Sequence, residues 1–228
     1  MSVISKIKTV INNPIAAIDY FFSRKLKWEG GGKLKVRDYN CYEEYVEHQK
    51  KKVNLMSGDF LEQGKEFGVM LEKRISDSGF AKEGMSVLCL GARLGYEVEA
   101  FINRGCFAVG VDLNPGKDNK YVLVGDFHKL VWADSSIDMV YTNSLDHSFD
   151  LEKVISEIVR VLKDGGFMVL EVCDGTDEGY RFDYYEACSW KKSSDVVDMF
   201  LKFGFVVEFK SRYTAPDIGN HVVFKIIK

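Results

Sequence analysis

The sequence predicts an α/β protein with a doubly wound, mainly parallel sheet and a helical extension at its N-terminus. From residue 85 onward, short apolar runs alternate with helical patterns, which favours a parallel sheet covered by helices on both faces. Before residue 80, apolar residues recur at helical spacing without intervening strands. We therefore expect a helical extension or lid over residues 1–80 and a ligand-binding domain over residues 81–228.

Size and composition indicate an ordinary globular protein. The chain has 228 residues, of which 46% are apolar and 29% are charged. Its net charge of -3 argues against a nucleic-acid partner. The five cysteines lack C-x-x-C spacing, which predicts reduced, buried thiols and a cytoplasmic location. The few histidines and carboxylates show no metal-ligand spacing, so we expect no metal.

Residues 1–37 carry an excess of lysine and arginine, and apolar residues recur at roughly helical spacing over residues 1–28. This amphipathic stretch has two interpretations. It is either a peripheral helix resting on an anionic membrane or a helix packed on its own domain or on a second copy of the chain in a homodimer. The run Gly30-Gly31-Gly32 that follows is expected to form a hinge.

Two helices are expected between residues 38 and 80. The first presents a stripe of Tyr42, Tyr45 and Val46, and the second covers residues 58–76 with Gly79 suited to its end. The segment around Tyr45 is either a lid over a ligand or simply a solvated face, because lysines follow it.

The remaining elements follow from apolar runs and caps. The helix 150–162 has the strongest support, because Asp150 suits the N-cap and apolar residues fall on one face. A further helix is expected at 94–104 and another near 192–203. Strands are expected at 86–90, 107–112, 121–124, 137–142 and 166–173, followed by an antiparallel pair near 204–211 and 221–227. The linker 114–119 is too short to hold a helix.

Three acidic or glycine-rich segments follow predicted strands. Gly91 and Gly95 bracket a turn between the first strand and a helix, where the backbone can approach a ligand closely and free N–H groups are available. Asp112 ends the next strand, where a carboxylate can accept hydrogen bonds from two ribose hydroxyls. Asp126, beside Phe127, can receive the exocyclic amine of an adenine while the ring covers its face.

Six ordered motifs resemble those of class I S-adenosylmethionine (SAM)-dependent methyltransferases. They are residues 87–95 (V-L-C-L-G-A-R-L-G), 110–112 (G-V-D), 125–127 (G-D-F), 136–141 (S-I-D-M-V-Y), 143–147 (N-S-L-D-H) and 157–166 (E-I-V-R-V-L-K-D-G-G). The resemblance implies a Rossmann-like, seven-stranded sheet whose last strand is antiparallel. It also implies SAM as cofactor, bound by Gly91, Ala92, Arg93, Gly95, Asp112, Leu113, Gly125, Asp126, Phe127, Asn143 and Ser144.

Two residues depart from this family pattern. Cys89 stands where an acidic residue is usual, and Arg93 stands where a glycine is usual. The methionine end of SAM must then be held by Glu97, by Arg93 itself or by groups from residues 42–52. The departures also leave open a non-catalytic module that binds SAM or a partner. A nicotinamide-dependent dehydrogenase would need G-x-G-x-x-G spacing, which the turn lacks.

For an active enzyme, the resemblance implies methyl transfer to a small molecule or a glycan, with oxygen as the expected nucleophile. His147 and Asp146 follow the fourth strand, so His147 is our candidate base and Asp146 a second candidate. His128 is expected to be structural. The aromatic loop 174–190 forms either a substrate wall or ordinary packing.

Overall fold

The computed structural model describes residues 27–51, 58–117 and 119–228. The basic amphipathic stretch over residues 1–26 lies outside these ranges, and so do the membrane and homodimer interpretations that depend on it. Within the described ranges, no helix has both the length and the apolar character needed to cross a bilayer.

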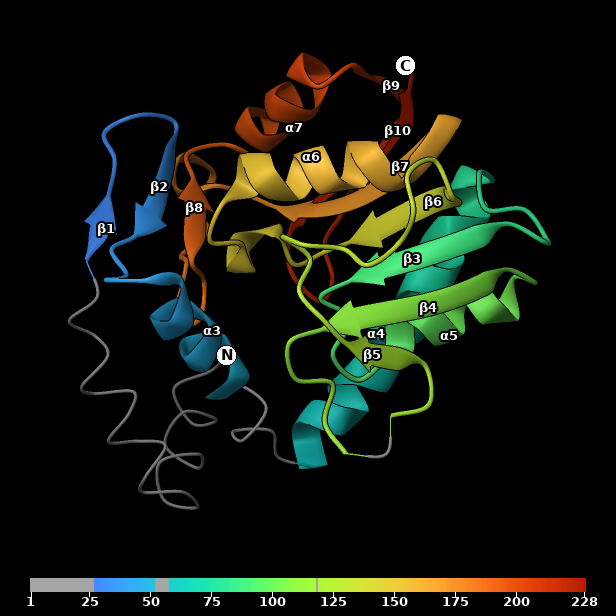
Figure 1. Cartoon of the computed structure of the whole chain (residues 1–228), viewed down its shortest axis with the longest axis horizontal. Helices are drawn as coiled ribbons and strands as arrows, with labels where there is room; N and C mark the ends of the chain where they lie inside the picture. The colour runs from blue at the N-terminus through green and yellow to red at the C-terminus, as the bar shows by residue number, and fades with distance from the viewer. Residues whose placement is uncertain (1–26, 52–57, 118) are drawn as a thin grey trace.

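A seven-stranded sheet forms the centre of the molecule, with the order β5-β4-β3-β6-β7-β10-β9 (Figure 1). The first five strands in this order are parallel, whereas β10 is antiparallel to both of its neighbours. This confirms the predicted doubly wound fold. The strands are β3 (Ser86–Leu90), β4 (Phe107–Asp112), β5 (Val122–Val124), β6 (Ile137–Thr142), β7 (Leu162–Cys173), β9 (Phe205–Tyr213) and β10 (Gly219–Ile226).

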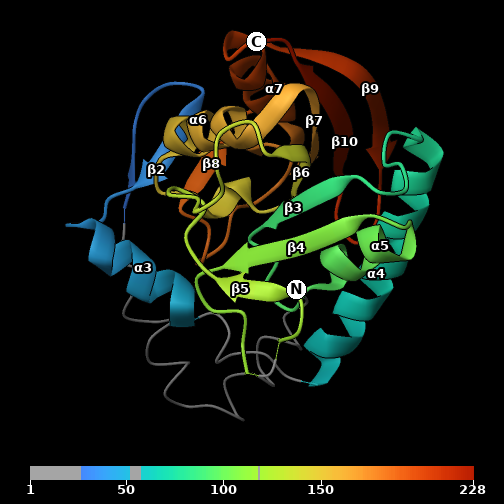
Figure 2. The same ribbon diagram turned by 45° about the vertical axis from the view of Figure 1, so that its right-hand side comes forward.

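Helices cover both faces of this sheet (Figures 1 and 2). On one face, α4 (Gly58–Ser78) packs with α5 (Tyr96–Asn103), and on the other lie α6 (Leu151–Val161) and α7 (Ser193–Lys202). The predicted cap is present, because the Asp150 side chain accepts a hydrogen bond from the Lys153 backbone N–H at 3.0 Å. Apolar residues on the inner face of α6 then fix it against the sheet.

A second, three-stranded sheet was not predicted. It consists of β1 (Trp28–Glu29), β2 (Leu34–Arg37) and β8 (Cys188–Trp190), all antiparallel. The run Gly30-Gly31-Gly32 connects β1 to β2 within a hairpin, so the expected hinge is instead a turn. Immediately after β2, helix α3 (Tyr42–Lys51) lies beside the carboxyl ends of β4 and β5 (Figure 1).

Two further boundaries bear on the site. Strand β7 starts at Leu162, directly after α6 and earlier than predicted, because Leu162 already pairs with Ile137 before the register shifts. Between β4 and β5 the described residues form a loop and no helix, as the linker length predicted. The Asn119 amide holds this loop by donating to the carbonyls of Arg93 and Pro115, at 2.9 and 3.1 Å.

Candidate active site

The turn after β3 is packed too tightly for any residue except glycine at its start. Gly91 has a φ of +69°, and a Cβ there would lie 2.7 Å from the Cβ of Ser144. The N–H groups of Gly91 and Ala92 both donate to the Val111 carbonyl, at 2.8 and 3.2 Å. The turn is therefore held between the end of β4 and the loop after β6.

That loop carries Asn143 and Ser144, which are bonded to each other and to the strands beneath. The Thr142 hydroxyl donates to the Leu90 carbonyl at 2.9 Å and accepts from the Ser144 N–H at 3.1 Å. The Ser144 hydroxyl in turn donates to the Asn143 side-chain oxygen at 2.9 Å. These bonds fix the two polar side chains at the edge where the parallel strands end.

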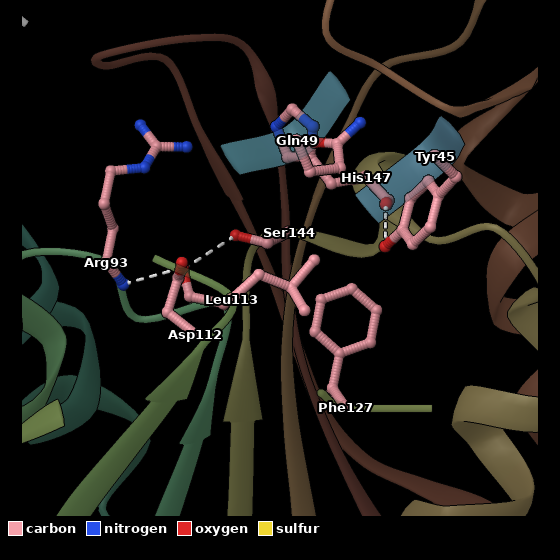
Figure 3. A pocket seen from close by; sticks show the side chains of 9 residues that line it. Tyr45, Gln49, Arg93, Asp112, Leu113, Phe127, Ser144 and His147 are labelled. Carbon is pink, nitrogen blue, oxygen red and sulfur yellow. Dashed lines mark hydrogen bonds between the residues drawn. The ribbon is translucent and has the colours of Figure 1, made fainter. Parts of the chain in front are cut away.

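Asp112 ends β4 and faces a small cavity (Figure 3). Its two carboxylate oxygens accept from the backbone N–H groups of Arg93 and Asn114, at 3.0 and 2.8 Å. An ionised carboxylate has about four acceptor sites, so two backbone bonds leave capacity for two ribose hydroxyls. The same cavity is lined by Tyr45, Gln49, Gly91, Arg93, Leu113, Phe127, Ser144 and His147.

Asp126 does not line this cavity, nor does Gly125. The Asp126 carboxylate accepts a short hydrogen bond from the Tyr42 hydroxyl, and it accepts from the His128 backbone and ring at 2.8 Å each. Burial alone would raise the pKa of Asp126, but the bonds from His128 and Tyr42 outweigh it and hold the pKa below its ordinary value. Its role as an adenine acceptor stays a prediction.

His128 has a structural position. Its Nε2 accepts from the backbone N–H groups of Phe149 and Asp150, at 3.1 and 3.2 Å, so the ring proton resides on Nδ1. Nδ1 then donates to Asp126, which ties that carboxylate to the start of α6. This agrees with the structural role expected for His128.

Helix α3 covers the Asp112 corner from above. The Tyr45 hydroxyl donates to the His147 carbonyl, and the Gln49 amide donates to the Tyr185 carbonyl, both at 2.9 Å. The space left over Asp112 and Phe127 is about 30 Å³, which is room for about two water molecules. If adenosine binds beside Asp112, as the sequence motifs predict, side chains of α3 must move outward to admit it.

A larger cavity of about 370 Å³ adjoins the glycine turn. It joins Gly91, Ala92 and Arg93 to Asn143, Asp146 and His147, so most of the predicted site residues meet here. Gly95 does not line it and instead forms the N-cap of α5. The wall is rich in acidic residues, because five carboxylate side chains and only one arginine, Arg93, line the cavity. The carboxylates are those of Glu97, Asp146, Glu171, Glu186 and Asp217.

His147 is oriented by a backbone contact. Its Nδ1 lies 2.9 Å from the Tyr185 carbonyl, which can only accept, so Nδ1 carries the proton and Nε2 is the basic atom of the neutral ring. Nε2 lies 3.8 Å from the Asp146 carboxylate. Among the described residues, Asp146, His147 and Glu186 form the one group of metal-ligand type, with donor atoms within 4.8 Å of one another.

Several wall residues were missed or only partly anticipated. Tyr180 and Glu186 come from the loop expected to be a substrate wall, whereas Trp190 of that loop is buried in the core and Asp174 pairs with Arg212. Tyr213 ends β9, and Pro216 and Asp217 follow it in the connection to β10, where the sequence showed no sign of a site.

The two cavities lie at the carboxyl ends of the parallel strands, which is where doubly wound sheets bind nucleotide-type ligands. Residues 88–170 match the methyltransferase domain family. Over 91 residues the chain is 31% identical to a malonyl-[acyl-carrier protein] O-methyltransferase of Coxiella burnetii, covering 37% of this chain and 32% of that protein. Over 145 residues it is 30% identical to a sterol 24-C-methyltransferase of Gibberella zeae, covering 57% of this chain and 37% of that protein.

The chain thus spans about a third of the length of these curated relatives. A SAM-dependent methyltransferase from Aquifex aeolicus has a similar structure, with a TM-score of 0.57 and 17% identity, covering 69% of this chain and 89% of that chain. Residues 88–170 thus match a methyltransferase domain, in agreement with the sequence motifs, and the Aquifex structure shows the same fold. Asp112 and the glycine turn lie where the sequence motifs predict the cofactor contacts, and their role in binding stays a prediction.

Proposed function

We propose that this protein transfers a methyl group from SAM to a hydroxyl of a polar small molecule or a glycan. One observation carries this proposal: a single cavity of about 370 Å³ connects the glycine turn after β3 to His147 and Asp146. Its volume falls in the range of small-molecule sites. A cytoplasmic setting, where the cysteines stay reduced, is part of the proposal.

Bound SAM would supply an electrophilic methyl group. The Asp112 carboxylate would accept hydrogen bonds from the ribose hydroxyls of SAM. Gly91, Asn143 and Ser144 would line the cavity that the bound cofactor occupies. The chain itself mainly has to align the two reactants, and such alignment contributes up to about 7–11 kcal/mol in favourable cases.

His147 is the group best placed to remove a proton from a hydroxyl acceptor. Nδ1 is committed to the Tyr185 carbonyl, so Nε2 would take the proton. The Asp146 carboxylate, 3.8 Å from Nε2, would then stabilise the imidazolium that forms.

The charge of the cavity wall limits which kinds of methyl acceptor can bind. Carboxylates such as Asp217 and Asp146 disfavour the anionic malonyl group on which the Coxiella relative acts, because like charges repel. They also disfavour an apolar sterol, because burying charged groups against hydrocarbon is costly. A polar, uncharged or cationic acceptor fits this wall best.

The experiment measures S-adenosylhomocysteine binding by calorimetry and then methyl transfer from labelled SAM to three acceptor sets. These are polyhydroxylated small molecules and sugars, malonyl thioesters, and sterols. We expect binding of the cofactor product and transfer only to the first set. Transfer confined to a thioester or a sterol would contradict the proposed acceptor, and absence of binding would overturn the proposed function.

A SAM-binding module without turnover is the second candidate, favoured by Cys89 and Arg93, which depart from the family pattern. It predicts product binding without transfer to any acceptor set.

Addition of EDTA is expected to leave turnover unchanged, because His147 acts here as a base. A loss restored by a divalent cation would reassign Asp146, His147 and Glu186 to metal binding.

A further inference from the structure

Arg93 occupies a backbone conformation that favours glycine. Its φ is +36°, and among the described residues only Ser135 shares a positive φ without being glycine. A side chain with a Cβ is disfavoured in this region, so a large residue kept there points to a use for its side chain. The backbone N–H of Arg93 donates to Asp112, while its side chain extends away from that carboxylate (Figure 3).

The guanidinium of Arg93 lies among acidic groups. Burial lowers the pKa of Arg93, while the carboxylates of Asp112, Glu97 and Asp146 counteract that shift. Arg93 also lines the larger cavity together with Gly91 and Asn143. A planar guanidinium in such a wall suits bidentate binding of a ligand carboxylate.

Glu97 lies in the first turn of α5 and is buried, with 8% of the residue exposed. Its carboxylate lines the same cavity as Arg93. On the strand beneath, Cys89 is fully buried, and the nearby Glu97 raises the pKa of its thiol further than burial does alone. The acidic group at this end of the cavity thus comes from α5, while β3 contributes an apolar thiol.

We propose that Arg93 and Glu97 together bind the amino acid end of SAM, with the guanidinium on the α-carboxylate and the Glu97 carboxylate on the α-ammonium group. A cation and an anion in one cavity wall complement the two charges of a zwitterion. This assignment rests on the proposed function, and it accounts for Cys89 and Arg93 as two parts of one arrangement.

The ionisation of Glu97 gives an independent signature. The pKa of Glu97 is raised to about 8, chiefly by burial and to a smaller extent by Asp112 and Glu171, although its own backbone N–H and Arg93 lower it. Tyr141 and Cys89 also face this carboxylate. In the free protein at pH 7, Glu97 is therefore mostly protonated. An ammonium group beside it favours the ionised form, so binding should release a proton.

The test compares two ligands on three variants. S-adenosylhomocysteine carries the amino acid end, whereas 5′-methylthioadenosine lacks it. Glu97→Gln and Arg93→Gly are expected to weaken S-adenosylhomocysteine binding at least tenfold and methylthioadenosine binding less than twofold. Glu99→Gln is the matched control, because it removes the same charge from an exposed position on the same helix. It should leave both affinities unchanged.

Two further measurements distinguish a role of Arg93 and Glu97 in binding from a loss of stability in the variants. Calorimetry at pH 7 in buffers of different ionisation enthalpy should show proton release in the wild type and none in Glu97→Gln. Arg93→Gly should keep the melting temperature or raise it by roughly 2–4 °C, because glycine tolerates a positive φ. A binding defect without loss of stability cannot be ascribed to unfolding.

The proposal is overturned if both variants bind S-adenosylhomocysteine as the wild type does, or if they lose both ligands equally. Either result would leave the proposed function standing, because the wild type would still bind the cofactor product. If the wild type binds neither ligand, the proposed function falls and this assignment falls with it.

Discussion

The Tyr42 hydroxyl donates a hydrogen bond to the Asp126 carboxylate, a residue 84 positions further along the chain. Burial raises the pKa of Tyr42, and Asp126 raises it further, so the hydroxyl remains a donor at any ordinary pH. Tyr42 begins α3 and Asp126 follows β5, so this bond fastens the covering helix to the sheet edge beside the Asp112 corner.

Replacing Tyr42 by Phe removes this fastening, so we expect S-adenosylhomocysteine to associate faster. A hydrogen bond to a charged group contributes about 1.5–3 kcal/mol, so easier opening of α3 should raise the association rate about tenfold or more. Stopped-flow fluorescence would measure the rate. The control is Tyr39→Phe. Tyr39 precedes α3, and its hydroxyl is bonded at 2.8 Å to His48 of that helix. Equal rates in the wild type and Tyr42→Phe would show that α3 does not limit entry.

Asp112→Asn tests the ribose contact. The side chain keeps its shape but loses its charge and one acceptor oxygen, so unsatisfied groups in the complex should cost about 1–3 kcal/mol. Calorimetry should show S-adenosylhomocysteine binding weakened roughly ten- to hundredfold. Glu208→Gln, at an exposed position on β9, makes the same chemical change away from the site. An unchanged affinity in Asp112→Asn would remove this residue from the cofactor site.

His147→Asn tests the proposed base. If Nε2 takes the acceptor proton, turnover should fall about 10²–10⁴-fold, while the affinity for S-adenosylhomocysteine stays within twofold. Asp146→Asn should lower turnover less, because its carboxylate acts through the imidazolium. The measurement is single-turnover transfer at saturating SAM. Normal turnover in His147→Asn would exclude a base role for this residue.

The buried pair of Arg74 and Glu171 should govern stability in acid. Burial would raise the pKa of Glu171, but bonds from His221 and Arg74 hold it below the ordinary value of 4.5. A depressed carboxylate pKa contributes stability above the ordinary value, and that stability is lost as pH falls through the pKa of the folded state. Urea unfolding should therefore show a falling free energy of unfolding as the pH drops below about 4.5.

Arg74→Met leaves Glu171 without the guanidinium and should lower the free energy of unfolding at pH 7 by about 3–5 kcal/mol. Its acid dependence should be shallower, because Glu171 then has a smaller pKa depression to lose. Lys73→Met is the neighbouring control, since Lys73 pairs with Asp77 on the exposed side of the same helix. Its effect should stay below about 1 kcal/mol. A steep acid slope that persists in Arg74→Met would assign the acid sensitivity to other groups.

The sequence predicted those helices and strands whose caps and apolar pattern lie within a short stretch of the chain. Asp150 caps α6, and apolar residues such as Ile155 and Ile158 recur on one face, so a short window contains the whole pattern. The strands β1, β2 and β8 have at most four residues each, and β2 pairs with β8 far along the chain, as Leu34 does with Trp190. No periodicity can develop over such lengths, so this sheet could not be predicted.

The candidate site divides in the same way. Gly91, Asp112 and Ser144 follow predicted strands and lie together because parallel strands end at one edge. Glu186 reaches the cavity through the long connection between β7 and β8, and Asp217 through the short one between β9 and β10. The course of both depends on tertiary contacts. The partners of Asp126 were also hidden, because Tyr42 meets it only once α3 is placed.

The pairing of β2 with β8 links the start of the described chain to the acceptor side of the cavity. Arg37, at the end of β2, donates to the carbonyls of Glu186 and Asp183, so the N-terminal hairpin sets the path of the chain that carries the wall residues. Exchange of this hairpin between relatives would alter acceptor preference while the cofactor edge stays untouched. The range of substrates would then change through the hairpin of β1 and β2, which lies outside the cofactor motifs and takes no part in the reaction itself.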